Sequence, residues 1–280
     1  MKAKEFSELQ DLVYRYSGIK LVDGKDAMVS ARLAQRLRAL GLETIEAYLD
    51  YLRANEKDEL VQLLNVISTN VTHFYREGKH FEELALALDG WIASGQRRVR
   101  VWCAASSTGE EPYTLAITVL EAARRHGVEL DARILATDIS TRVLNQASEG
   151  RYLASKVDPI PKDQLERYFQ KVSGGAGEDE YQVRDSLRRL VTFKRLNLSK
   201  PPFPMRGPHD AIFCRNVMIY FDDPMKAQVV ETFAQQLASD GALFIGHSEN
   251  IRGCTTALEA APIPQGFCYR PIVMTKKAAA

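Results

Sequence analysis

Long apolar runs, a charge excess and cysteine clusters are all missing from this sequence of 280 residues. Its apolar stretches have the length of strands and fall short of the roughly 20 residues that cross a bilayer. No apolar signal-peptide core follows Met1. The formal net charge of +1 provides no overall field that would attract nucleic acid or a membrane. We therefore expect a cytoplasmic protein that neither binds nucleic acid nor inserts into a membrane.

Cysteine is too sparse to suggest a metal or disulfide framework. The cysteines lie far apart, and none belongs to a CxxC pair or a Cys/His cluster, which zinc sites and disulfide-stapled folds require. They are Cys103, Cys214, Cys254 and Cys268. We expect reduced thiols and no metal. With 45% hydrophobic residues, the chain can build an ordinary apolar core.

Residues 1–76 are predicted to form a helical domain. Apolar side chains recur there at helical spacing, and Gly18 and Gly41 follow the first two predicted helices as stops. Thr44 is expected to cap the third helix. The predicted helices lie between Phe6 and Tyr16, between Asp26 and Leu40, between Ile45 and Leu52, and between Leu60 and Ile67.

Residues 77–274 are predicted to form an α/β domain, because strand-like and helix-like runs alternate from about residue 97. This order is typical of an open, mostly parallel sheet with helices on both faces. The glycine-rich stretch Ser173–Gly177 lies between two short β-like runs, which predicts a small antiparallel β-subdomain inserted at about 160–192. Residues 275–280 are expected to be a tail. Strands are predicted at 99–105, 133–137, 191–196, 211–215 and 242–246, and helices at 112–126, from 141, and at 224–238.

A loop of small residues follows the first predicted strand, where doubly wound sheets bind their ligands. Its sequence is AASSTGEEP at residues 104–112, with Pro112 predicted at the first helical position. The phosphate-loop sequence and the three-glycine dinucleotide fingerprint are both missing. Glu110 and Glu111 would repel a pyrophosphate but suit a ligand with a cationic end and free hydroxyls, such as S-adenosylmethionine.

Asp138 ends the second predicted strand and has two competing interpretations. An acidic residue in this place binds ribose hydroxyls in dinucleotide folds. Asp138 also precedes Ile139-Ser140 and a predicted helix, where it would serve as the N-cap. The sequence alone leaves both interpretations open.

Several separate motifs resemble those of one enzyme family. The segments STNVTHFYRE at 68–77 and STGEEPY at 107–113 resemble motifs of the chemotaxis-receptor glutamate methyltransferases, the CheR family. The segments DAIFCRNVMIYF at 210–221 and GHSE at 246–249 follow in the family's order, with shorter matches at 136–139, 150–152 and 197–198. Relatives often have two phenylalanines where this chain has Phe74-Tyr75. The resemblance extends from about residue 5 to residue 270.

The resemblance implies a Rossmann-like S-adenosylmethionine-dependent methyltransferase sheet with an inserted antiparallel β-subdomain and an all-α N-terminal domain. The implied cofactor is S-adenosyl-L-methionine, and the implied product is S-adenosyl-L-homocysteine. Taken singly, Asn70 and Thr72 also suit the cap of a helix that is expected to begin near Glu77. Arg215, Asn216 and Tyr220 also suit packing. The residues that match the family's cofactor site are Asn70, Thr72, Arg76, Glu111, Asp138, Asn197, Leu198, Arg215 and Asn216.

The implied activity is that of a protein-glutamate O-methyltransferase acting on bacterial chemoreceptors. A glutamate carboxylate has a pKa of about 4.3 and is ionised at neutral pH, so the reaction needs no general base. Alignment of the carboxylate oxygen with the methyl carbon and sulfur lowers the barrier. We expect Arg76 to orient the carboxylate through its planar guanidinium. Tyr220 is expected to add a hydrogen bond or to shape the approach of the methyl group.

Two surfaces are candidates for contact with the cytoplasmic domains of chemoreceptors. The first is basic and lies on the second predicted helix, although a solvated face is the commoner meaning of such a run. Its residues are Lys25, Arg32, Arg36 and Arg38. The second is the predicted hairpin, because some family members grip the receptor's C-terminal pentapeptide with the β-subdomain. Gly174 and Gly175 would let a peptide backbone approach there. A monomer is expected.

Other functions remain as alternatives. A non-catalytic signalling protein could keep the fold and bind receptors, but intact Arg76, Glu111, Asp138 and Tyr220 argue against it. A methyltransferase for nucleic acid is disfavoured by the near-zero net charge, and a nicotinamide-dependent oxidoreductase by the missing glycine fingerprint.

Overall fold

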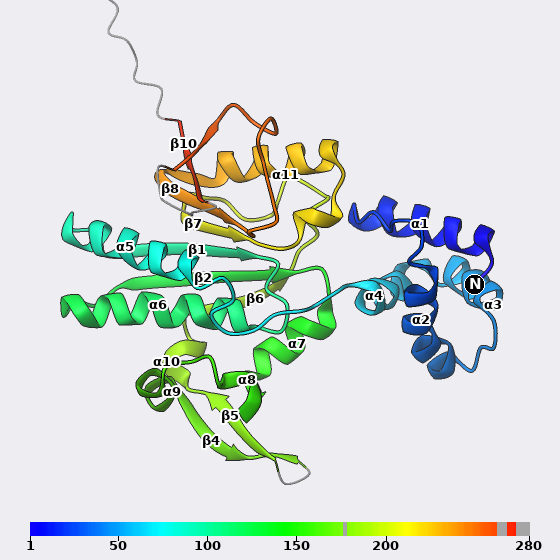
Figure 1. Cartoon of the computed structure of the whole chain (residues 1–280), viewed down its shortest axis with the longest axis horizontal. Coiled ribbons are helices and arrows are strands. Elements are labelled where there is room, and N and C mark those ends of the chain that lie inside the picture. The colour runs from blue at the N-terminus through cyan, green and yellow to red at the C-terminus, as the bar shows by residue number, and fades with distance from the viewer. Residues whose placement is uncertain (176–177, 262–267, 273–280) are drawn as a thin grey trace, which may run out of the picture.

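The computed structural model describes residues 1–175, 178–261 and 268–272, so the predicted tail at 275–280 lies outside the described residues. The chain has a helical domain, a seven-stranded sheet with helices on both faces, and a three-stranded sheet. Figure 1 shows the helical domain at one end of the long axis and the three-stranded sheet beneath the larger one. None of the helices in these ranges is long and apolar enough to cross a bilayer.

Helices α1 to α4 form the helical domain, as the sequence predicted. Gly18 and Gly41 end the first two helices in the left-handed conformation. Thr44 Oγ1 accepts a hydrogen bond from Ala47 N at 3.1 Å and so caps the third. Leucine, valine and tyrosine side chains from all of them pack into one core. The helices are α1 (Ala3–Ser17), α2 (Asp26–Leu40), α3 (Ile45–Ala54) and α4 (Glu56–Ile67).

The large sheet is mostly parallel, as the alternation of strands and helices predicted. Its strands run in the order β6-β2-β1-β7-β8-β10-β9, and neighbouring strands from β6 to β8 are parallel. Strand β10 is antiparallel to β8 and to β9. The strands are β1 (Arg98–Ala104), β2 (Asp131–Asp138), β6 (Val191–Arg195), β7 (His209–Cys214), β8 (Leu237–Ile245), β9 (Leu258–Ala260) and β10 (Cys268–Pro271).

Helices cover both faces of this sheet because its central strand is apolar on both sides. On β1, Val99, Val101 and Cys103 join the core cluster that contains α5 and α6. Trp102 and Ala104 point the other way and join the cluster that contains α11. All of them are buried, which is typical of a strand inside a parallel sheet. The covering helices are α5 (Lys79–Ala93), α6 (Glu110–His126), α7 (Thr141–Glu149) and α11 (Asp223–Gln236).

The structure departs from the sequence prediction at three elements of this domain. Helix α5 begins at Lys79, close to the predicted start near Glu77, but the short strands β9 and β10 were not predicted. Helix α6 begins at Glu110, so Pro112 is its third residue and not its first. A proline is tolerated there because the N–H groups of the first helical turn have no intrahelical partner.

The small sheet contains the predicted hairpin and one further strand. Strands β4 (Phe169–Ser173) and β5 (Asp179–Val183) pair antiparallel. Strand β3 (Arg151–Leu153) pairs with the other side of β5, in the order β3-β5-β4. The small sheet therefore begins before the predicted limit of about 160, because its third strand directly follows α7. The accompanying helices are α8 (Ala154–Val157), α9 (Lys162–Tyr168) and α10 (Asp185–Arg188). In the loop between β4 and β5, residues 176–177 lie outside the described ranges.

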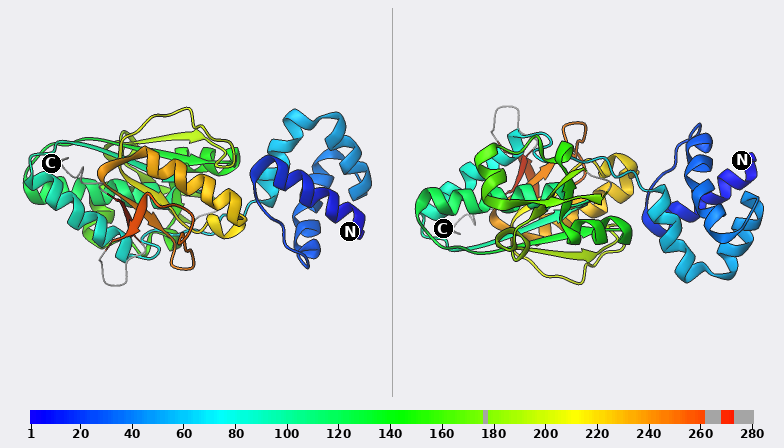
Figure 2. Two further views of the ribbon diagram at one scale, coloured as in Figure 1. Left: turned by 90° about the horizontal axis from the view of Figure 1, so that it is seen from above. Right: turned by 90° about the horizontal axis from the view of Figure 1, so that it is seen from below.

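The helical domain contacts the sheet domain through the end of α1. A Cβ atom at Gly18 would lie 3.0 Å from Met225 Cε and 3.1 Å from Ser199 Cβ. Next to this contact, Lys20 N donates a hydrogen bond to Tyr220 O at 2.8 Å. Figure 2 shows the helical domain at the same end of the molecule in both views. Glycine at position 18 therefore allows both the left-handed turn and the close approach of the two domains.

Replacing Gly18 tests this contact. Gly18→Ala and Gly41→Ala place a Cβ atom at nearly the same backbone angle, with φ of 69° and 68°, but nothing lies within 4 Å of Gly41. The left-handed conformation costs about 1–2 kcal/mol in each case. We expect Gly18→Ala to lose about 1 kcal/mol more than Gly41→Ala in denaturant unfolding, because Ser199 and Met225 must move. Equal losses would contradict the close contact between the domains.

Candidate functional site

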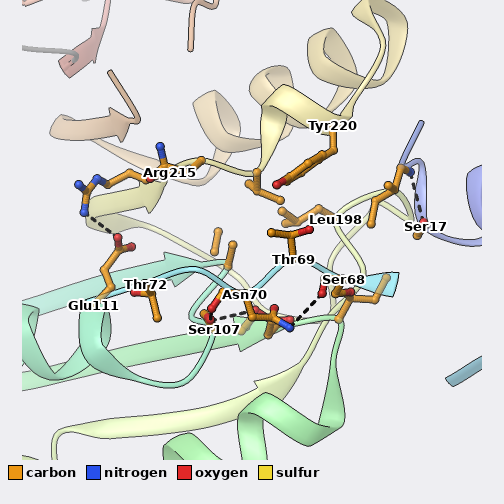
Figure 3. Close-up of a pocket in the computed structure, with 18 of the residues that line it drawn as sticks. Ser17, Ser68, Thr69, Asn70, Thr72, Ser107, Glu111, Leu198, Arg215 and Tyr220 are labelled. Carbon is orange, nitrogen blue, oxygen red and sulfur yellow. Dashed lines mark hydrogen bonds and ion pairs between the residues drawn. The ribbon is translucent and has the colours of Figure 1, made fainter. Parts of the chain in front are cut away.

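A pocket lies at the carboxyl ends of β1, β2 and β7, where open α/β sheets bind their ligands. Figure 3 shows labelled side chains converging on it from both domains. All the residues predicted to bind the cofactor line this one pocket, and so does Tyr220. They are Asn70, Thr72, Arg76, Glu111, Asp138, Asn197, Leu198, Arg215 and Asn216. Residues more than a hundred positions apart therefore share one cavity.

Asp138 holds the loop that follows β1. Its Oδ2 accepts a hydrogen bond from Ser107 N at 2.9 Å, and its Oδ1 accepts one from Ser140 N at 2.9 Å. The N-cap of α7 is Ser140, whose Oγ accepts from Val143 N at 3.4 Å, so the N-cap interpretation of Asp138 is wrong. Burial raises the pKa of Asp138, although backbone N–H groups favour its carboxylate form. This carboxylate lines the pocket as an acceptor of hydrogen bonds.

Arg215 is buried between two carboxylates. Its guanidinium nitrogens lie 2.7 Å from Glu111 Oε2 and 3.0 Å from Glu77 Oε2, and its side chain is 0% exposed. Nη2 also donates to the carbonyl oxygen of Arg76 at 2.5 Å. Burial acts to raise the pKa of Glu77, but Arg215 and Asn216 outweigh it and hold this pKa below its ordinary value. Arg215 therefore forms ion pairs at the end of β7 in addition to its packing contacts.

Glu249 shapes the turn that follows β7. Its carboxylate accepts hydrogen bonds from four backbone N–H groups: Asn216 at 2.8 Å, Val217 at 3.0 Å, Met218 at 2.7 Å and Gly246 at 2.6 Å. These bonds hold Asn216 at φ 58° and begin the short 3-10 helix η2 (Met218–Tyr220), which carries Tyr220. The sequence analysis noticed the GHSE motif but gave Glu249 no role. Its signal was an acidic residue just after a buried strand.

Backbone strain gathers around the pocket. Among the described residues, the non-glycine residues with positive φ are Tyr75 (56°), Glu77 (55°), Ser107 (47°) and Asn216 (58°). Ser107 and Asn216 line the pocket, and the other two flank Arg76, which lines it as well. Such conformations cost of order 1–3 kcal/mol each and persist where surrounding contacts fix them. Arg76 is fixed further by a hydrogen bond from Nη1 to Val71 O at 2.7 Å.

The helical domain supplies one wall of the pocket, which the sequence analysis missed. Ser17 and Ile19 reach it from the end of α1, and Ser68 and Thr69 reach it from the end of α4. Asn197 Nδ2 donates to the carbonyl oxygen of Tyr16 and ties this wall to the sheet domain. Nothing in these residue types marks them as ligand contacts. Asn70 and Thr72 do not cap α5, because the N-cap of that helix is Gly78.

The basic residues of α2 have different surroundings. Arg36 forms an ion pair with Glu59, which is 2% exposed, and Arg32 donates to the carbonyl oxygen of Ile67 and to Thr69 Oγ1. Lys25 and Arg38 are exposed. The structure therefore does not present these four side chains as one free basic face. Arg32 is instead connected to the segment that enters the pocket.

The fold and the pocket together define a class of protein. The pocket lies at the carboxyl ends of parallel strands, beside a loop of small residues and a carboxylate that ends the second strand. This is the arrangement of Rossmann-like enzymes. The phosphate-binding glycine motifs are missing, and Glu111 and Asp138 suit a ligand with a cationic end and hydroxyl groups. The class is that of Rossmann-like S-adenosylmethionine-dependent methyltransferases.

Comparison with known proteins gives the family. Residues 4–68 match the CheR methyltransferase all-alpha domain, and residues 70–267 match the CheR methyltransferase SAM binding domain. The chemotaxis protein methyltransferase of Salmonella typhimurium is 42% identical over 249 residues, which are 88% of this chain and 83% of that protein. The chemotaxis protein methyltransferase of Borreliella burgdorferi is 38% identical over 255 residues, 89% of each chain. The chain belongs to the CheR methyltransferase family, and its cofactor is S-adenosylmethionine.

Glu249→Gln tests the turn that shapes this pocket. A neutral amide offers one weaker acceptor and turns two donors toward backbone N–H groups that are themselves donors. We expect the free energy of unfolding to fall by at least about 2 kcal/mol and the affinity for S-adenosylhomocysteine to fall with it. The matched control is Glu231→Gln, because Glu231 is exposed on α11 and accepts hydrogen bonds from two side chains, Thr255 Oγ1 at 2.6 Å and Gln235 Nε2 at 3.4 Å. Its effect should stay within about 0.5 kcal/mol, and an equally small effect at Glu249 would contradict its role.

Proposed function

We propose that this chain transfers the methyl group of S-adenosylmethionine to glutamate side chains of bacterial chemoreceptors and so forms glutamyl methyl esters for sensory adaptation. The observation that carries the proposal is one pocket lined by every residue predicted to bind the cofactor, Arg76 among them, and by Tyr220, in a chain of the CheR family. The relatives named above are chemotaxis protein methyltransferases. The enzyme is proposed to work as a monomer in the cytoplasm.

The pocket residues fit the chemical groups of the cofactor. The buried carboxylate of Asp138 at the end of β2 can accept hydrogen bonds from ribose hydroxyls. Glu111 supplies negative charge toward a cationic ligand, and Arg215 fixes its side chain at 2.7 Å. Leu198 provides an apolar surface in the same pocket. When bound, S-adenosylmethionine supplies an electrophilic methyl group on a sulfonium.

The acceptor carboxylate needs orientation and no proton transfer. A glutamate side chain is ionised at neutral pH, so its oxygen is already a nucleophile. The planar guanidinium of Arg76 can hold the oxygen that does not attack, which leaves the other oxygen free to align with the methyl group. Its backbone is fixed between two left-handed residues, Tyr75 and Glu77. Tyr220 lines the same pocket and can give a second hydrogen bond.

Arg76→Ala is expected to lower kcat by roughly 100-fold, because a misplaced acceptor loses alignment. The affinity for S-adenosylhomocysteine should change much less. Arg76→Lys should recover little activity, since an ammonium lacks the planar fork. Arg98→Ala is the control, because Arg98 is exposed at the opposite, amino end of β1. Equal losses of turnover and cofactor affinity in Arg76→Ala would make Arg76 a cofactor residue only.

Methyl-labelled S-adenosylmethionine and receptor cytoplasmic fragments test the function itself. Base-labile label, released as methanol, identifies a carboxyl ester. Label in the receptor that resists base would reject the glutamate ester. A chain that binds the cofactor and the receptor but transfers no label would be the non-catalytic signalling protein. The intact pocket supports the enzyme over this alternative.

On α2, we assign receptor contact to the exposed basic residues. Lys25 and Arg38 are free to meet a glutamate-rich receptor helix, whereas Arg32 and Arg36, predicted for the same role, have partners inside the chain. Arg32 Nη2 donates to Thr69 Oγ1 at 3.1 Å, and Thr69 lines the pocket. Arg32 thus positions the segment from 68 to 72 that enters the cofactor site.

Variants of α2 separate these two roles. Arg32→Ala should weaken binding of S-adenosylhomocysteine by roughly 3- to 10-fold, the loss expected for one or two hydrogen bonds. Arg38→Ala should leave that affinity unchanged and raise the KM for the receptor. The KM effect of Arg38→Ala should also shrink at high salt, because exposed charges are screened. Unchanged cofactor affinity in Arg32→Ala would contradict this positioning role and would support the receptor-binding role that was predicted for Arg32.

The small sheet supports a second contact, to the receptor's C-terminal pentapeptide. In the described chain its outer strands β3 and β4 each pair on one side only, with β5. An extended peptide can add to such an edge through main-chain hydrogen bonds. Gly174 and Gly175 lie at the end of β4, and no atom lies within 4 Å of the Cβ position of Gly175. The tether remains part of the proposal.

A further inference from the structure

Two histidines and a glutamate gather directly behind Arg215, outside the cofactor pocket. Glu77 precedes α5, His80 lies in its first turn, and His247 follows β8. One potential ligand atom from each lies within 4.8 Å of the other two. His80 Nδ1 is 3.6 Å from Glu77 Oε2, and the two imidazole rings lie 5.0 Å apart, edge to face. Residues separated by about 170 positions in the sequence therefore lie in one cluster.

His80 is buried without a hydrogen-bond partner for its ring. Its side chain is 0% exposed, and neither Nδ1 nor Nε2 has a partner among the described residues. The distance to Glu77 is too long for a hydrogen bond. Burying a polar group without a hydrogen-bond partner costs about 1–3 kcal/mol in stability. An ion bound to the ring would remove this cost. The ring nitrogens face the carboxylate of Glu77 and the ring of His247.

We propose that Glu77, His80 and His247 form a binding site for a divalent transition-metal ion of the zinc type. Two imidazoles and one carboxylate are a donor set that such ions favour, and they leave a coordination position open. His247 is exposed, so an ion can enter from its side. The sequence analysis expected no metal, because these residues form no spaced motif and only the fold brings them together.

The geometry requires a small movement of one ligand. Donor atoms about 2.0–2.1 Å from a tetrahedral zinc ion lie about 3.3 Å apart, which is close to the 3.6 Å between His80 and Glu77. The larger separation of up to 4.8 Å must shrink. The exposed side chain of His247 is the ligand that can move, whereas His80 is packed beside Phe244.

The neighbouring charges set the strength of this site. Glu77 Oε2 also accepts from Arg215 at 3.0 Å, and Glu77 Oε1 accepts from Asn216 Nδ2 at 3.2 Å. A carboxylate has about four lone-pair sites, so it can keep these bonds and bind an ion. The positive charge of Arg215 opposes a cation and lowers its affinity. An ion here would hold Glu77 in place and, through it, the Arg215–Asn216 wall of the cofactor pocket.

Calorimetric titration of the full, untagged, chelator-treated chain with Zn²⁺ tests the site. We expect one ion per chain, and Co²⁺ should give visible ligand-field absorption at the same stoichiometry. His247→Ala should weaken binding more than the roughly 10- to 100-fold that loss of an outer-shell partner costs. His126→Ala is the matched control, because His126 also pairs with a carboxylate, Asp89 at 2.9 Å, but lies at the far end of α6. The affinity of His126→Ala for Zn²⁺ should equal that of the parent chain.

Three outcomes overturn the site: no Zn²⁺ binding by the parent chain, unchanged binding in His247→Ala, or equal losses in His247→Ala and His126→Ala. His80→Gln gives an independent check, since it removes the buried ring and keeps a polar side chain. Thermal unfolding without metal verifies that each variant is folded. If His80→Gln fails to fold, the exposed His247 still decides the result. Methyl transfer is measured separately, so failure of the metal site leaves the proposed reaction standing.

Discussion

The buried guanidinium of Arg215 joins three segments that are far apart in the sequence. It lies at the end of β7 and binds Glu77 before α5 and Glu111 at the start of α6. A charge in the interior is stable only when it is paired and hydrogen-bonded, so each partner must stay in place for the others to be tolerated. One of these carboxylates lines the cofactor pocket, and the other adjoins Arg76. The ion pairs therefore connect the end of β7 to the segment that carries Arg76 and to the start of α6.

Strained backbone is arranged around this same group. Arg76 stands between two left-handed residues, and Asn216 takes a left-handed conformation under the hold of Glu249. Sparsely populated conformations persist only when several contacts over-determine them. Here those contacts are the carboxylates of Glu77 and Glu249. The strain places side chains in the pocket that an ordinary strand or helix end would direct elsewhere. The proposed reaction would benefit, because it depends on alignment.

The helical domain is part of the cofactor site as well as a candidate receptor surface. Ser17 and Ile19 line the pocket, Gly18 permits the domain contact, and Arg32 holds Thr69. Arg32 therefore connects α2, the candidate receptor surface, to residues 68–72, which line the pocket. The two-domain architecture therefore gives this enzyme a physical link between a candidate receptor surface and the pocket.

The sequence by itself determined the elements with strong local signals. Apolar spacing and the terminal glycines placed α1 and α2, Thr44 placed the start of α3, and the apolar strands placed the parallel sheet. Each motif is contiguous, so the motifs were enough to predict the cofactor residues, all of which line one pocket. The sequence did not place the start of α6 at Glu110, and it did not predict the short strands β9 and β10.

Tertiary structure decided the contacts that join distant residues of ordinary type. The role of Glu249, the pocket wall formed by Ser17 and Ile19, the internal partners of Arg32 and Arg36, and the meeting of His80 with His247 have no local pattern. Periodicity and capping act over a few residues along the chain, whereas burial and ion pairing act between whichever residues the fold brings together. For that reason the cofactor and the fold class could be predicted from the sequence, whereas only the folded chain shows which contacts hold the pocket in shape.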